Sequence, residues 1–172
     1  MKPKSPIIWF TALAATGIAL AANTPKSDAP VQVTFVAPEK FTDVSDEWSS
    51  SDGNRSHVLA EFKAQIESLA RNYITGGRHL EVKVTDIDLA GDFEPWRGPD
   101  FSHIRILREI YVPRVTLEFR LIDAEGKVLN EGKRQLANPG YLMTSALPTN
   151  DPLRYDKENI REWMRREFGR PS

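Results

Sequence analysis

The sequence contains no cysteine among its 172 residues. Disulfide bonds, thiolate zinc sites and cysteine nucleophiles are therefore excluded, and so is the acylated cysteine of a lipoprotein anchor. Without such links the chain must be stabilised by burying apolar side chains in a core. The composition, 40% hydrophobic and 27% charged residues, is that of one ordinary globular domain.

An excess of positive charge is also missing. The chain carries 23 basic and 24 acidic side chains, which gives a formal net charge of −1 at pH 7. This balance excludes the basic surface that nucleic-acid binding requires. The H-E-x-x-H, G-x-S-x-G, P-loop and dinucleotide-binding motifs are absent as well, so we expect neither a cofactor nor a metal site.

Long hydrophobic runs are scarce, and the most prominent one lies near the N-terminus. Lys2 and Lys4 precede an apolar run over residues 7–22, in which Ala19 and Ala21 are small residues suited to a cleavage site. This pattern is typical of a secretory signal peptide, and the run is shorter than the about 20 apolar residues of a membrane-spanning helix.

The chain should therefore be exported to the periplasm of a bacterium. We expect three parts: a cleaved signal peptide over residues 1–21, a flexible lead over 22–30, and a single soluble α/β domain over 31–172. No second apolar run is long enough to cross a membrane, so no membrane span should remain after cleavage.

Alternation of apolar and polar side chains predicts five strands in the domain, over residues 31–35, 80–84, 103–108, 115–121 and 127–136. Two helices are predicted from one apolar stripe each. The first stripe consists of Leu59, Phe62, Ile66, Leu69 and Tyr73; the second helix opens at Asp151-Pro152 and carries Ile160, Trp163 and Phe168 on its stripe. The expected fold class is α+β, a two-layer sandwich in the order β-α-β-β-β-β-α, with a largely antiparallel sheet of about five strands and two helices on one face.

Three segments resemble the motifs of a known family. They are Val33–Val36 with Pro38–Asp43, the central motif Thr85–Gly91, and Leu153–Lys157 with Trp163. Together they resemble the family labelled domain of unknown function 3016, exported bacterial proteins without an assigned activity. The resemblance spans about residues 31–168 and departs from the family at Gln135–Asn138, where an acidic residue is expected beside Tyr141. It implies export and an α/β domain, and it implies no chemistry.

The central motif interrupts the regular alternation of apolar and polar residues in the strand that precedes it. Asp86 and Asp88 share the parity of the apolar residues Leu80, Val82 and Val84. A regular strand would therefore direct both carboxylates into the core, which is unfavourable for an unpaired charge. We expect a bulge or an exit from the core near Thr85. The two aspartates would then emerge at a rim, followed by Asp92 and His103.

Three roles are open for this candidate rim, formed by Asp86, Asp88, Asp92 and His103. The aspartates could accept hydrogen bonds from backbone amides or pair with one of three arginines, Arg97, Arg105 or Arg108, which is the role we expect. Oxygen ligands at alternate positions could hold calcium, although the spacing does not fit an EF-hand. Carboxylates beside a histidine could also perform acid/base chemistry.

A candidate binding loop follows the rim, with the aromatic residues Phe93, Trp96 and Phe101 between and beside Pro95 and Pro99. The aromatics could form a lip for a sugar or a peptide. They could instead fold back and close the end of the core, which is the arrangement we expect.

No nucleophile arrangement or metal constellation is recognisable in the chain, which favours a non-catalytic function. The expected function is a binding or accessory domain of the cell envelope, with an unidentified envelope component as its partner. The alternative is a metal-dependent or acid/base hydrolase that uses Asp86, Asp88 and His103.

Overall fold

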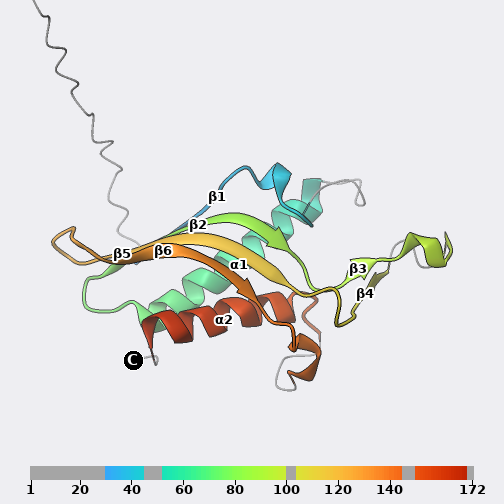
Figure 1. The fold of residues 1–172 in the computed structure, drawn as a ribbon. Helices are drawn as coiled ribbons and strands as arrows, with labels where there is room; N and C mark the ends of the chain where they lie inside the picture. Colours follow the sequence, from blue (N-terminus) through green and yellow to red (C-terminus); the bar gives the residue numbers. More distant parts are fainter. Residues whose placement is uncertain (1–29, 45–51, 100–103, 145–149, 170–172) are drawn as a thin grey trace, which may run out of the picture.

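The computed structural model describes residues 30–44, 52–99, 104–144 and 150–169 (Figure 1). Its helices and strands are β1 Val31–Phe35, α1 Asp52–Tyr73, β2 His79–Asp88, β3 Asp92–Phe93, β4 Arg105–Ile106, β5 Arg114–Ile122, β6 Val128–Ala137 and α2 Arg154–Phe168. A single turn of 3-10 helix, η3 Pro95–Arg97, separates β3 from β4.

The main sheet has four strands in the order β1-β2-β5-β6. β1 runs parallel to β2, and the other two pairings are antiparallel. Both helices lie on one face of this sheet (Figure 1), so the predicted α+β sandwich is confirmed. The strand expected over residues 103–108 does not join the main sheet, because its described part, β4, pairs with β3 in a separate ladder.

The core lies between the sheet and the two helices. Phe62 and Ile66 of α1 are fully buried, as the apolar stripe predicts, while Leu59 and Leu69 are partly buried. Trp163 of α2 is also buried, and its ring lies 5.8 Å from the ring centroid of Phe119 in β5. Burial of these side chains is the main source of the stability of the fold.

The expected bulge is present in β2. The register between β2 and β5 shifts between Val84 and Asp86. Beyond this shift Ile87 is fully buried, whereas Asp86 and Asp88 are only half-buried. Beyond the bulge, the side chains that point into the core are those that would face solvent in a regular strand. Both carboxylates therefore lie outside the core.

The described residues include no helix with the length and apolar character needed to cross a bilayer. The predicted signal peptide and the lead up to residue 29 lie outside the described ranges, so both remain predictions.

Candidate functional site

A two-stranded arm projects from the end of the main sheet (Figure 1). We define the arm as residues 92–99 and 104–111, which include β3, η3 and β4. Three large apolar side chains of the arm are exposed: Trp96 by 71%, Ile104 by 53% and Ile110 by 71%. The expectation that the aromatic loop closes the core is therefore wrong for Trp96.

The other two aromatic residues of the candidate loop differ from Trp96. Phe93 is half-buried, and the guanidinium of Arg105 lies 4.7 Å from its ring centroid, in a cation–π contact. Phe101 and His103 lie outside the described residues. The structure therefore places Trp96 and Phe93 in different surroundings on the same arm.

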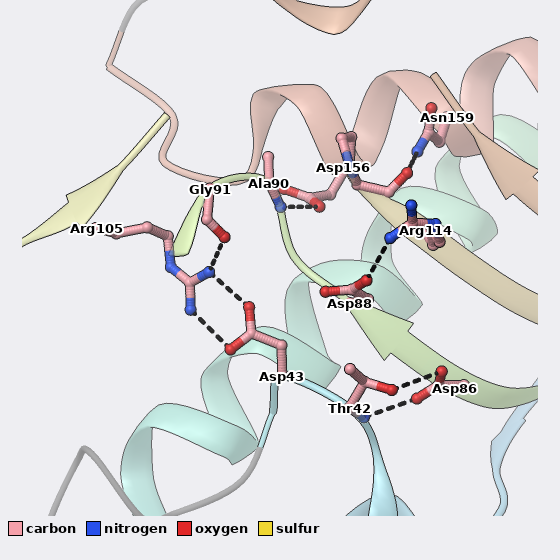
Figure 2. Close-up of polar contacts among 11 residues, drawn as sticks. Thr42, Asp43, Asp86, Asp88, Ala90, Gly91, Arg105, Arg114, Asp156 and Asn159 are labelled. Atoms are coloured by element: carbon pink, nitrogen blue, oxygen red, sulfur yellow. Dashed lines mark hydrogen bonds and ion pairs between the residues drawn. The ribbon is translucent and has the colours of Figure 1, made fainter. Parts of the chain in front are cut away.

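Asp86 fastens the segment after β1 to the bulge. Its carboxylate accepts two hydrogen bonds from Thr42, one from the backbone N–H at 2.7 Å and one from the hydroxyl at 2.9 Å (Figure 2). These are the contacts that a structural role for this aspartate predicts.

Asp88 binds a different partner, across the ladder of β2 and β5. Arg114 Nη1 donates to Asp88 Oδ2 at 3.0 Å, between two residues that lie directly opposite in the register. Burial raises the pKa of the Asp88 carboxyl above its ordinary value, and the hydrogen bond and charge of Arg114 oppose that rise in part. Asp88 therefore pairs with an arginine, as expected. The arginine is Arg114, which lies further away in the sequence than the three arginines named above.

A bidentate ion pair joins the base of the arm to the segment that follows β1. Arg105 of β4 contacts the two carboxylate oxygens of Asp43 at 2.5 and 3.0 Å and also donates to the carbonyl of Gly91 at 2.7 Å (Figure 2). The ends of the arm are tied together because Gly91 N–H donates to the carbonyl of Tyr111 at 3.2 Å. Bidentate arginine–carboxylate pairs fix orientation as well as distance.

Within the arm, a buried glutamate accepts hydrogen bonds from two other residues of the arm. Glu94 is nearly inaccessible to solvent, and its two carboxylate oxygens accept hydrogen bonds from Arg108 at 2.9 Å and from the Tyr111 hydroxyl at 3.0 Å. Because both oxygens of this buried carboxylate are hydrogen-bonded, the fold avoids the cost of an unsatisfied buried charge, and loss of either partner would be unfavourable. The arm is therefore held internally as well as at its base.

Asp156, in the first turn of α2, is a further carboxylate that contacts the chain near the base of the arm. Its side chain is 1% exposed, and its Oδ1 accepts a hydrogen bond from Ala90 N–H at 3.0 Å (Figure 2). Burial raises the pKa of this carboxyl to about 7, against the lowering effect of the Ala90 hydrogen bond. Asp156 was not among the predicted site residues, although it is a carboxylate at helical spacing from the apolar residue Ile160. A carboxylate among apolar positions is also what distinguished Asp86 and Asp88.

A small cavity of about 240 Å³ lies between the rim and the base of the arm. Asp88 and Asp92 of the candidate rim line it together with Asp43, Tyr111 and Arg114. Asp92 is exposed, and its Oδ1 accepts a hydrogen bond from the neighbouring Phe93 N–H. Asp86 does not line the cavity, so the structure brings two of the predicted rim residues together there.

Metal ligation was the second role open for the rim. Within the described ranges, no group of three or more histidine, aspartate or glutamate side chains is arranged to hold a metal ion. Two of the carboxylates that line the cavity are already paired, Asp43 with Arg105 and Asp88 with Arg114.

These observations define a two-layer α+β domain with a braced arm that carries exposed apolar side chains. The family described as "Protein of unknown function (DUF3016)" matches residues 29–166 of the chain. The chain belongs to this family, as the three sequence motifs predicted. No curated protein matches the chain.

Proposed function

We propose that this protein is an exported, non-catalytic domain that binds a component of the bacterial cell envelope through its arm. The observation that carries the proposal is the 71% exposure of Trp96 at η3. Tryptophan is enriched among the residues that dominate binding energy at protein interfaces. Ile104 and Ile110 are two further large apolar side chains that are exposed on the arm.

The braces of the arm support a binding role. The Arg105–Asp43 ion pair and the buried Glu94 hold the arm in one orientation. A surface that is already ordered loses less conformational entropy on binding than one that must first become ordered. The carboxylates at the base of the arm then position the binding surface.

The contacts of the central motif favour this role over the hydrolase alternative. Asp86 and Asp88 accept hydrogen bonds from separate partners, Thr42 and Arg114 (Figure 2). Two carboxylates that act together on one substrate would instead face a shared space. The hydrogen bonds of Asp86 and of Asp88 are both explained if these residues hold the rim and the arm in position.

Export is the second element of the proposal, and it rests on Lys2, Lys4 and the apolar run over residues 7–22. N-terminal sequencing of the protein from a periplasmic fraction should begin near Ala22. Recovery of a product that retains Met1 in the membrane fraction would contradict export.

Binding through the arm can be tested by capture from envelope extract, with the mature chain as bait. Trp96→Ala should lose the envelope component that the unchanged chain retains, because the largest exposed apolar side chain of the arm is removed. Met143→Ala is the matched control, since Met143 is 83% exposed and lies outside the arm. Equal capture by Trp96→Ala and the unchanged chain would refute a binding role for the arm.

A further inference from the structure

β6 forms an edge of the main sheet. It pairs with β5 on one side, and no described strand pairs with its other side. An edge strand leaves alternate backbone N–H and C=O groups without a sheet partner, so it can receive another strand. β6 spans residues 128–137, which is long enough to support a strand–strand interface.

The solvent-facing side of the sheet carries two rows of charges that end at this edge. In the first row Glu81, Arg120 and Glu131 lie opposite one another across β2, β5 and β6; in the second row the corresponding residues are Lys83, Glu118 and Lys133. The first row is negative, positive, negative, and the second has the reverse order. Arg120 lies 3.4 Å from both Glu81 and Glu131, so the alternation favours the pairing of adjacent strands.

We propose that two copies of this chain pair through β6, antiparallel, about a two-fold axis that passes Gly132. Glu131 then lies opposite Lys133 of the partner subunit, and Lys133 lies opposite Glu131 of the partner subunit. Both charge rows continue across the interface without a change in their alternation. Closed two-fold interfaces of this kind are the commonest form of assembly for soluble proteins.

The position of the axis follows from the geometry of the sheet. Residues that lie directly opposite in an antiparallel pair point to the same face, so a two-fold axis perpendicular to the sheet must pass a residue that lies opposite itself. An axis at Glu131 or Lys133 would place like charges against each other, which is destabilising. Gly132 has no side chain to repel its own copy, and it lies between the two charges that match.

A groove lies between the end of β6 and α2, next to the place that the second strand would take. It has a volume of about 690 Å³ and lies between the end of β6, at Arg134–Pro139, and the Glu158–Glu167 part of α2. In the Gly132 register, Leu136 lies opposite Val128 of the partner subunit, whose side chain would enter this groove. The groove is also lined by Trp163, whose buried Nε1 has no acceptor among the described residues.

The charges provide a test that separates this interface from general loss of folding. The mature chain should sediment as a dimer, whose dissociation constant rises with salt because the matched charges are at the surface. Glu131→Lys places lysine against lysine, and Lys133→Glu places glutamate against glutamate. Each variant alone should raise the dissociation constant by on the order of tenfold or more, since two opposite-charge pairs become repulsive.

Mixing the two variants should restore the dimer. In the mixed pair, the lysine introduced in one variant faces the glutamate introduced in the other, and the unchanged Lys133 faces the unchanged Glu131. Lys83→Glu is the matched control, because Lys83 lies on the same face of the sheet in the interior strand β2. That variant should dimerise like the unchanged chain.

Three results would overturn the proposal. They are an unchanged chain that remains monomeric up to about 100 μM, a dimer that neither charge reversal weakens, and a mixture of the two variants that dimerises no better than each alone. If β6 instead receives a strand from another protein, the purified chain will be monomeric and the first result will be observed. Far-UV circular dichroism of each variant distinguishes failure to pair from failure to fold.

Discussion

Substitution of Asp156 by asparagine isolates the energetic effect of a buried carboxyl at the base of the arm. Asparagine retains a side-chain oxygen that can accept the hydrogen bond from Ala90 N–H, which lies 3.0 Å from Asp156 Oδ1. The substitution therefore removes ionisation while it preserves the acceptor. Any change in stability that depends on pH can then be assigned to the charge.

The sign of the effect follows from the two pKa values of this carboxyl. Burial raises the folded pKa of Asp156 to about 7, whereas an unfolded aspartate has a pKa of about 3.9. Between these values the folded state binds more protons than the unfolded state, so the free energy of unfolding falls as the pH rises. At about 1.4 kcal/mol for each pKa unit, the loss amounts to about 4 kcal/mol by pH 7 to 8.

Urea denaturation at a series of pH values measures this effect. The free energy of unfolding of Asp156→Asn minus that of the unchanged chain should rise by about 4 kcal/mol between pH 4 and pH 8. Asp151→Asn is a control of opposite sign: burial acts to raise the pKa of Asp151, but hydrogen bonds from Lys157 and Leu153 lower it overall. Above the unfolded pKa, this control should lose stability relative to the unchanged chain. A difference for Asp156→Asn that does not change with pH would show that folding does not raise the pKa of the Asp156 carboxyl.

Three further substitutions test the packing of the fold by urea or thermal denaturation. Phe62→Ala should lower the free energy of unfolding by about 3–5 kcal/mol, because a fully buried aromatic ring is removed; a loss below about 1 kcal/mol would show that the α1 stripe faces water. Trp163→Ala should lower the melting temperature sharply, since its ring packs against Phe119, and an unchanged melting temperature would contradict its place in the core. Gly91→Ala should destabilise by about 1–3 kcal/mol, because Gly91 has a positive φ and a Cβ there would lie 2.8 Å from the carbonyl of Ile106; a neutral result would show that the backbone can relax at this position.

The bulge in β2 shows how far the sequence alone can identify a structural irregularity. Asp86 and Asp88 share the parity of Val84, and two carboxylates in the core are unfavourable. From this local conflict the shift near Thr85 could be predicted, and the register confirms it. The stripes of α1 and α2 are equally local patterns, which is why both helices and their buried face could be predicted.

Partners far apart in the chain could not be predicted in this way. Asp88 was expected to pair with Arg97, Arg105 or Arg108 if it paired with an arginine, but the register of β2 and β5 places Arg114 directly opposite it. Asp156 contacts Ala90 only because the first turn of α2 lies beside the residues that follow β2. The base of the separate β3–β4 ladder is held by contacts of Arg105 with Asp43 and Gly91, and no periodic pattern in the sequence predicts such contacts.

Binding of an envelope component by the arm can be observed in intact cells by site-specific crosslinking. A photoreactive derivative of phenylalanine, which keeps an aromatic ring at the position, replaces Trp96, which is 71% exposed on the arm, or in a separate strain Met143, which is 83% exposed outside it. Position 96 should give a discrete crosslinked product in the envelope fraction, and position 143 should not give that product. No product at position 96, or the same products at both positions, would contradict the proposed role of the arm.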